Sequence, residues 1–366
     1  MFSSFPSARR GGPLGRVAVL LAVVALVLGG CSITSTSGAP ASPSVAFATI
    51  APVTTPAPTA APSPTPTPAP AFPATLTGDD GTAVTLAAEP QKIVSLTPAV
   101  TETLFAVGAG DRVVATDDAS DYPADVKTLP HVVDFGTVDV EKIVSLDADL
   151  VIAGGAGFTS ADAIAKLRSL KIPVLVVSSS TLDQIYADLA LVGTAAGEKE
   201  AGTALAESVR DDMTAIGTAS QAAGQQAGTK PRVFYDVGYI DTTGQIYGPA
   251  KGSFLDEMLE MLGVDVITGD AVTYEVPLET LIERDPQVII LGTNAFYMPT
   301  PATVAKRTGW SALSAVKSGD IRSVADTEIT RPGPRLATGM RNLALAMYPN
   351  LVLPSAAPSG APTASP

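Results

Sequence analysis

Short runs of β-branched and aliphatic residues alternate along the chain with longer segments whose apolar residues recur at helical spacing. The runs occupy residues 92–96, 112–116, 149–154, 173–178, 232–238, 265–269, 287–292 and 320–324. Such runs predict strands, and strands separated by helices favour parallel sheets that are covered on both faces. The pattern therefore predicts an α/β protein with two similar lobes and mainly parallel sheets.

Capping residues support two of the predicted helices. Thr97 followed by Pro98 predicts a helix start, and Gly108 predicts its end. Ser253, with Asp256 three residues later, predicts a capping box at the start of a second helix. Both helices follow a predicted strand, which agrees with the α/β alternation.

A longer helix is predicted between the two lobes, over residues 198–228. This segment has no β-branched run, and its apolar residues form a thin seam of Leu205, Val209, Met213 and Ile216. A thin seam with many alanines predicts a helix that packs on one side and faces water on the other. At 1.5 Å per residue the helix would be about 40 Å long, which is enough to bridge two lobes.

One short sequence occurs twice, at an offset of 138 residues. VEKIVSLDADLVIAGG at 140–155 and LETLIERDPQVIILGT at 278–293 share a glutamate, an aspartate, an isoleucine and a glycine at the same places. Each copy predicts a short helix that leads into a strand. The repeat supports the prediction of two similar lobes.

The shared glutamates are predicted to lie on the surface. In the first copy Val140, Ile143 and Val144 fall on one helical face, and Glu141 is rotated by about 100° from Val140. The second copy has the same pattern around Glu279. Both glutamates should therefore point toward solvent. An acid at this position has a simpler explanation as well, because it favours a helix N-terminus.

The N-terminal segment has the features of an export signal. Three arginines precede an unbroken apolar run, VAVLLAVVALVL, which ends in two glycines and Cys31. The run is too short for a stable membrane-spanning helix. A basic start, an apolar middle and small residues at the end are typical of a signal peptide, here residues 1–30. The chain is therefore expected to leave the cytoplasm.

Cys31 is the only cysteine of the chain. The sequence LGGC resembles the lipobox of bacterial lipoproteins, which implies that Cys31 is acylated on sulfur and becomes the new N-terminus. The alternative is a small buried thiol. A single cysteine excludes an intramolecular disulfide and a thiolate metal cluster, so the stability must come from an ordinary core.

Residues 31–78 are predicted to carry the acylated cysteine on a disordered tether. No charged residue occurs between Val17 and Gly78, and Ala, Pro, Ser and Thr dominate from residue 32 onward. Such a segment cannot bury enough apolar area to offset its chain entropy, and its prolines make it stiff. Residues 351–366 are predicted to be a tail of the same kind. The remainder divides into an N-terminal lobe at 79–197, the bridging helix at 198–228 and a C-terminal lobe at 229–350.

The charge of the chain limits its partners. Removal of the signal peptide would take away three arginines and move the formal net charge from −13 to −16. An acidic excess of this size argues against nucleic acid or anionic lipid as the partner. The charge does not identify the ligand.

The folded part resembles the substrate-binding lipoproteins of ABC importers for vitamin B12, ferric siderophores and haem. The similarity covers about residues 88–350 in the family's order. It is carried by KIVSLTPAVTETLFAVGAGDRVVATDD, SDYP, VEKIVSLDADLVIA, the long mid-chain helix, GPAKGSFLDEMLEMLG and RPGPRLATG. No single motif is decisive, but the ordered set is specific.

The resemblance implies a monomeric binding protein without catalytic activity. It implies two α/β lobes joined by one long helix, with a small-molecule metal chelate of cobalt or iron held in the cleft between them. It also implies that Glu141 and Glu279 dock onto arginines of an ABC permease dimer with its ATPase. A two-fold symmetric importer presents two equivalent sites, so a one-chain partner needs an internal repeat to meet both. The chain would be lipid-anchored on the outer face of the cell membrane, or periplasmic.

The loops beyond the strands hold candidate ligand contacts. In α/β sheets ligands bind past the carboxyl ends of the strands, and flat aromatic faces suit a corrin or a porphyrin. Arg331 and Arg335 are candidates for an anionic group, because guanidinium forks match carboxylates and phosphates. Each residue taken singly could instead anchor a loop or lie on the surface. The aromatic candidates are Phe135, Phe158, Tyr239, Tyr247, Tyr274, Phe296 and Tyr297.

The identity of the chelate stays open. Phe135 stands where cobalamin-binding members of the family often have tryptophan, and Ala119 stands where they often have tyrosine. The lone His131 argues against a site for a bare metal ion, because such sites gather several imidazoles and carboxylates. No cofactor and no protein-ligated metal are expected, because the chelator supplies the ligands of the metal.

Two other functions compete with transport. A ligand sensor could bind the same compounds and pass a signal to a membrane partner. An enzyme would need catalytic groups, but GGAG at 154–157 lacks the spacing of a dinucleotide loop, and His131 has no evident triad partner. The pair Asp117 and Asp118 is interpreted as turn residues.

Overall fold

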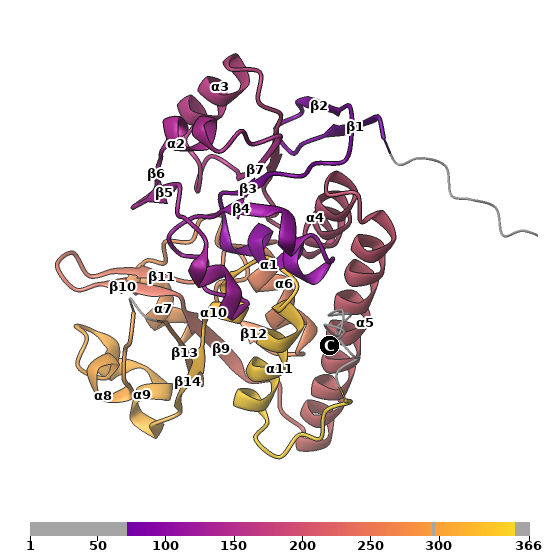
Figure 1. Cartoon of the computed structure of the whole chain (residues 1–366). Helices are drawn as coiled ribbons and strands as arrows, with labels where there is room; N and C mark the ends of the chain where they lie inside the picture. The colour runs from indigo at the N-terminus through magenta and orange to yellow at the C-terminus, as the bar shows by residue number, and fades with distance from the viewer. Residues whose placement is uncertain (1–71, 295–296, 356–366) are drawn as a thin grey trace, which may run out of the picture. The chain divides into compact units, whose positions relative to one another are not determined.

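The computed structural model describes residues 72–294 and 297–355 (Figure 1). The predicted signal peptide, Cys31 and most of the predicted tether lie outside the described residues. Phe296 and the end of the predicted tail lie outside them as well. None of the described helices is long and apolar enough to cross a membrane.

The N-terminal lobe is built on a parallel sheet with the strand order β4-β3-β7-β8. Every residue of β3 and β7 is buried, as expected of strands covered on both faces. The strands are β3 (Ile93–Ser95), β4 (Val113–Ala115), β7 (Leu150–Gly154) and β8 (Val174–Val177). The helices of this lobe are α1 (Pro98–Ala106), α2 (Val140–Ser145), α3 (Ala161–Ser169) and α4 (Leu182–Ala195), with 3₁₀ turns at Gly110–Arg112 and Ala124–Thr128.

The C-terminal lobe repeats this plan with the strand order β12-β9-β13-β14, again parallel. The strands are β9 (Arg232–Asp236), β12 (Asp265–Val266), β13 (Val288–Thr293) and β14 (Ile321–Ala325). The helices are α6 (Phe254–Met261), α7 (Leu278–Arg284), α8 (Pro301–Val304), α9 (Ser314–Ser318), α10 (Thr327–Thr330) and α11 (Leu336–Met347), with a 3₁₀ turn at Trp310–Ala312. The predicted α/β class with parallel sheets is confirmed.

Three antiparallel hairpins accompany the two sheets. They pair β1 (Ala74–Thr77) with β2 (Ala83–Leu86), β5 (Val133–Asp134) with β6 (Thr137–Val138), and β10 (Gly238–Ile240) with β11 (Gln245–Tyr247). Strand β1 corrects the sequence analysis, which placed residues 74–77 in the tether. The run ATLT alternates in burial and finds a partner in β2, which the composition of the preceding segment concealed.

Helix α5 (Lys199–Ala227) joins the two lobes and ends at Gly228, which adopts a left-handed conformation. It packs against α4 of the N-terminal lobe and against α6 and α11 of the C-terminal lobe (Figure 1). One hydrophobic cluster runs through this junction and contains Leu189 of α4, Met213 of α5 and Leu343 of α11. The predicted bridging helix therefore shares a continuous core with both lobes.

Two local predictions need correction. Ser253 caps α6 by accepting a hydrogen bond from Asp256 N, but the Asp256 carboxylate accepts its bond from Gly252 N instead of closing a capping box. Val144 falls on the same predicted helical face as Ile143, and Ile282 takes the matching place in the second copy, yet both side chains are exposed. The short helices α2 and α7 each bury a narrow stripe around Ile143 or Leu281, so the neighbouring aliphatic residue faces outward.

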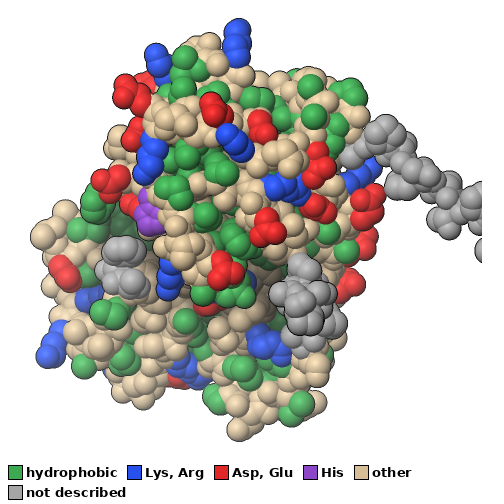
Figure 2. Space-filling model, in the orientation of Figure 1, with side chains coloured by type: hydrophobic (Ala, Val, Ile, Leu, Met, Phe, Trp, Pro, Cys, Tyr) green, Lys and Arg blue, Asp and Glu red, His purple; other side chains and the backbone are tan. Residues whose placement is uncertain are grey.

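The surface carries charges of both signs. On the face shown in Figure 2, Lys and Arg side chains alternate with Asp and Glu side chains and form no broad basic patch. Such a mixed surface offers no continuous electrostatic track for a nucleic acid on that face.

Candidate functional site

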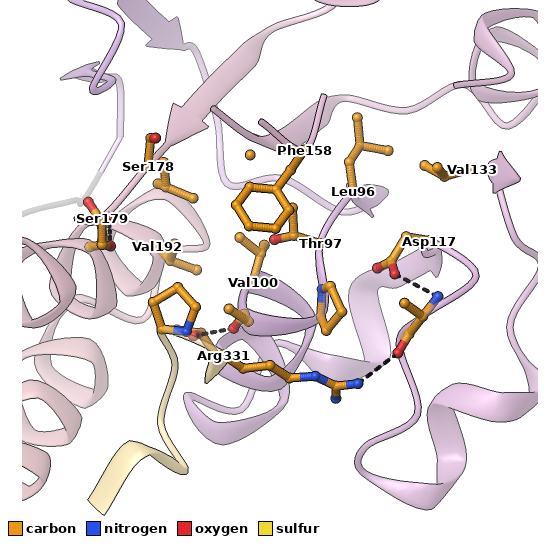
Figure 3. Close-up of a pocket in the computed structure, with 18 of the residues that line it drawn as sticks. Leu96, Thr97, Val100, Asp117, Val133, Phe158, Ser178, Ser179, Val192 and Arg331 are labelled. Atoms are coloured by element: carbon orange, nitrogen blue, oxygen red, sulfur yellow. Dashed lines mark hydrogen bonds between the residues drawn. The ribbon is translucent and has the colours of Figure 1, made fainter. Parts of the chain in front are cut away.

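A cavity of about 370 Å³ lies at the carboxyl ends of the strands of the N-terminal lobe. Its wall is formed by segments that follow β3, β4, β7 and β8, and includes Leu96, Asp117, Phe158 and Ser178 (Figure 3). Among the described lining residues, the C-terminal lobe contributes residues 330–332. Ligands of α/β proteins bind at this end of the strands, so the cavity is the candidate binding site.

The lining is largely apolar. Leu96, Val100 and Val192 form part of its wall, and the Phe158 ring projects among them (Figure 3). Phe158 is 67% exposed although it lines a cavity, so its ring has free surface to offer a ligand. An apolar cavity with a few polar groups is the usual form of a small-molecule site.

The charged groups on the wall are mostly acidic. Asp117 is buried, and its carboxylate accepts hydrogen bonds from Ala119 N at 2.8 Å and from Ser120 Oγ. Burial raises the pKa of Asp117 despite these bonds. Asp118 also lines the cavity. Sequence analysis assigned both residues to a turn, which is where they lie, but missed that this turn borders the cavity.

Asp188 on α4 is the third acidic residue of the wall. Burial raises its pKa to about 7, and the neighbouring Asp79 carboxylate adds to the rise, while the hydrogen bond from Ser179 Oγ opposes it. Asp79 belongs to the turn between β1 and β2 and accepts a hydrogen bond from Ser178 N. Nothing in the sequence near Asp188 indicates this role, because the partner carboxylate comes from a distant hairpin.

The two predicted anion-binding arginines are held by carboxylates of the opposite lobe. Arg331 lines the cavity and donates to Asp121 Oδ1 at 2.6 Å, to Glu102 Oε1 at 3.1 Å and to the Ala119 carbonyl oxygen at 3.1 Å. Arg335 is not among the described residues that line the cavity. It donates two hydrogen bonds to the Glu102 carboxylate, of 2.9 and 2.6 Å. Because Glu102 and Asp121 already compensate these guanidiniums, the cavity is acidic on balance.

The aromatic candidates of the C-terminal lobe are placed elsewhere. Tyr239, Tyr247, Tyr274 and Tyr297 are not among the described residues that line the cavity. Tyr297 donates a hydrogen bond to Asp236 Oδ2 at 3.0 Å and accepts one from Arg307 at 2.6 Å.

Arg307 contacts two of these aromatic side chains, Tyr239 and Tyr297. Its guanidinium lies 4.1 Å from the ring centroid of Tyr239 and 4.5 Å from that of Trp310. It also forms a 2.7 Å ion pair with buried Asp236. Tyr239 and Tyr297 thus have structural partners within the lobe. A ligand-binding role for Tyr239, Tyr247, Tyr274 and Tyr297 stays a prediction.

Phe135 occupies an unusual position next to the cavity. It forms the turn of the β5–β6 hairpin together with Gly136, which lines the cavity, and both residues have positive φ, 45° for Phe135 and 77° for Gly136. The Phe135 side chain is 94% exposed, and its backbone N–H donates to Asp118 Oδ2 at 3.0 Å. A bulky residue at positive φ is strained, and strain of this kind is concentrated at functional sites.

The repeated glutamates lie on the surface, as predicted. Glu141 is in the first turn of α2, Glu279 is in the first turn of α7, and both are exposed. In the part of the chain that the structure describes, neither carboxylate forms a salt bridge within 4.0 Å. Both are therefore available to a partner.

No metal site emerges from the described residues. Within 72–294 and 297–355, no group of three or more His, Cys, Asp or Glu side chains is placed to hold a metal ion. His131 is exposed, and its carbonyl oxygen accepts a hydrogen bond from Lys142.

Two parallel-sheet lobes on a shared helix, with a cavity at the strand ends, define a two-lobed ligand-binding protein. Residues 93–327 match the family model described as periplasmic binding protein, and the chain belongs to this family.

Curated relatives extend this similarity over most of the chain. An uncharacterized ABC transporter substrate-binding lipoprotein, YvrC of Bacillus subtilis, is 32% identical over 284 residues, which are 76% of this chain and 87% of that protein. A vitamin B12-binding protein of Vibrio cholerae is 30% identical over 249 residues, which are 67% of this chain and 84% of that protein. Both relatives are thus named as binding proteins, the first of them as the substrate-binding lipoprotein of an ABC transporter.

Solved structures show the same fold. The periplasmic vitamin B12-binding protein BtuF of Vibrio cholerae superposes with a TM-score of 0.57 at 27% identity, covering 70% of this chain and 96% of that one. The periplasmic haem-binding protein RhuT of Roseiflexus sp. RS-1 gives a TM-score of 0.61 at 24% identity, covering 71% and 98%. The predicted family and fold are thus confirmed.

Proposed function

We propose that this chain is the extracytoplasmic substrate-binding lipoprotein of an ABC importer, which captures a metal chelate at the cavity and delivers it to the permease. The observation that carries the proposal is the cavity at the strand ends of the N-terminal lobe, bordered by residues 330–332 of the C-terminal lobe. A cavity of about 370 Å³ is at the lower end of the range for small-molecule sites. A corrin or porphyrin would fill it with one edge and extend past Phe158 and Phe135.

The charges of the cavity favour a neutral or cationic cargo with N–H donors. Asp117, Asp118 and Asp188 line the wall. Arg331, the one arginine among the described lining residues, is compensated by Glu102 and Asp121. An anionic group placed there would lose its hydration without gaining an unpaired cation. A corrinoid with amide side chains or a cationic ferric hydroxamate therefore fits better than haem, whose propionates are anionic.

The surface helices support delivery to a symmetric permease. Glu141 and Glu279 occupy equivalent exposed positions on α2 and α7, so the two lobes present the same carboxylate to two equivalent sites. The proposed partners are the permease dimer and its ATPase. Acylation of Cys31 would anchor the chain to the outer face of the membrane, with the Pro-rich segment as the tether.

A panel of chelates tests the proposed binding function. The melting temperature of the protein is measured with cyanocobalamin, cobinamide, a ferric hydroxamate and haem. Ligand at 100 times its Kd stabilises the folded state by about 2.7 kcal/mol, which corresponds to roughly 5 °C for a protein of this size. We expect such a shift for a corrinoid or the hydroxamate and a smaller one for haem. The proposal fails if no chelate raises the melting temperature.

A further inference from the structure

The two repeated surface helices expose an aliphatic side chain at the same place. Val144 on α2 is 43% exposed and Ile282 on α7 is 41% exposed. Each lies three residues after the repeated glutamate and one residue after the side chain that its helix buries, Ile143 in α2. A polar residue would be less costly at a solvent-facing position, so packing within the lobe does not explain why both copies are aliphatic.

Most other features of the repeat have a structural reason. The aspartates that follow the helices adopt positive φ, 53° at Asp147 and 41° at Asp285, a conformation that Asp tolerates better than most residues. A Cβ on Gly154 would come within 2.7 Å of Thr97, and one on Gly292 would crowd Asp326 in the same way. With these positions explained, the repeat still contains an exposed acid and an exposed aliphatic residue in each lobe.

The acid and the aliphatic residue form one surface. Residues three apart on a helix are neighbours, so Val144 lies beside Glu141, and Ile282 lies beside Glu279. On the N-terminal lobe a shallow groove continues this surface and is lined by Glu141, Val144 and Leu170 among others. A complementary partner must therefore offer a cation next to an apolar contact, and must do so twice.

We propose that Val144 and Ile282 make the apolar contacts of a two-site docking surface, each against one of two equivalent permease subunits beside the basic groups that receive Glu141 and Glu279. This inference rests on the proposed function and names what adds affinity at the interface. Exposed ion pairs contribute little free energy and act mainly on encounter and orientation. Completing the burial of a half-exposed aliphatic side chain contributes about fivefold in affinity, or about 25-fold for the pair.

Variants separate the apolar contribution from the ionic one. Val144→Ser with Ile282→Ser removes the aliphatic groups, and because Ser has about the helix propensity of Val and Ile, α2 and α7 should persist. Glu141→Gln with Glu279→Gln removes the charges. Leu345→Ser on α11 is the matched control, since Leu345 is 38% exposed. The melting temperature and chelate affinity of each variant confirm that the lobes are intact.

The assay is the affinity for a permease–ATPase complex in lipid nanodiscs, chosen as the complex whose ATPase activity the wild-type chain stimulates. It is measured at about 0.05 M and about 0.5 M NaCl, because exposed charges are screened over this range and apolar contacts are not. We expect the double Ser variant to bind about 25-fold more weakly at both salt concentrations. The double Gln variant should bind more weakly at low salt only, and the Leu345 control should match the wild type.

The outcomes distinguish this inference from the proposed function. If the double Ser variant binds like the wild type while the double Gln variant is weakened, the apolar role of Val144 and Ile282 is refuted and docking through the glutamates stands. If neither double variant is weakened, the docking assignment itself is wrong. Equal loss in the Leu345 control would show a general effect of surface apolar residues and would also refute the inference.

Discussion

Replacing Phe135 by asparagine should have two effects: it should stabilise the folded protein, and it should weaken chelate binding. Phe135 and Gly136 connect β5 to β6 with φ of 45° and 77°. A turn with two positive φ values prefers Asn-Gly, because asparagine tolerates the left-handed region and phenylalanine does not. The 94% exposure of Phe135 means that the substitution removes almost no packing from the lobe. The strain at Phe135 therefore needs a reason outside the fold.

The expected magnitudes follow from this geometry. A bulky residue in the left-handed region costs about 1 to 2 kcal/mol, so relief by asparagine should raise the unfolding free energy by about 1 kcal/mol and the melting temperature by about 2 °C. A ring that stacks on a chelate and becomes buried contributes about 2 kcal/mol. Loss of the ring should therefore raise the Kd for the chelate by roughly 30-fold.

Differential scanning calorimetry and ligand titration measure the two effects on the same samples. The chelate is the one that raises the melting temperature of the wild type. Phe135→Ala is the control, because alanine removes the ring but keeps the unfavourable φ, so binding should weaken with little stabilisation. Wild-type affinity in the Asn variant would refute the ligand contact. An unchanged melting temperature in that variant would refute the argument from strain.

Three further predictions concern the ion pairs, the cavity and the docking helices. Glu102→Gln should lower the unfolding free energy, measured by urea titration, by about 3 kcal/mol, because it leaves Arg331 and Arg335 without their buried partner. Asp121 is exposed, so Asp121→Asn should lower the unfolding free energy by less than about 1 kcal/mol. Because burial raises the folded pKa of Asp188 to about 7, this group binds more protons in the folded state and destabilises it as the pH rises from about 4 to about 7. Asp188→Asn should therefore gain stability relative to the wild type over that interval, and a constant difference would contradict this. Glu141→Lys with Glu279→Lys should keep chelate affinity but abolish stimulation of the permease ATPase; undiminished stimulation would remove the docking role.

The fold could be predicted because buried parallel strands have a recognisable sequence pattern. Strands covered on both faces are continuous aliphatic runs, as in Leu150–Gly154 and Val288–Thr293, and these runs stand out from the helices around them. The bridging helix could be predicted equally well from its thin seam of apolar residues. Strand β1 was missed because its ATLT run is short and follows a long stretch of similar composition.

The site was harder to predict, because its residues are defined by partners that are distant in the chain. Arg331 and Arg335 have the chemistry of anion binders, but the sequence cannot show that Glu102, more than two hundred residues earlier, compensates both. From the sequence, Asp188 is an ordinary helix residue. In the structure, the β1–β2 turn places Asp79 next to it. The position of Phe135 in a strained turn is likewise a property of backbone geometry, and only its aromatic character could be read in advance.

The two lobes differ at the proposed ligand site and agree at the proposed docking surface, and this contrast has a physical cause. The N-terminal lobe supplies most of the described cavity wall, and the C-terminal lobe supplies residues 330–332. A cargo held mainly by one lobe does not require the other to match it. A two-fold symmetric permease does require matching contacts, because each of its equivalent subunits must contact the same groups on the binding protein. The exposed acid and aliphatic residue of α2 and α7 are the features of the repeat that such a requirement would preserve.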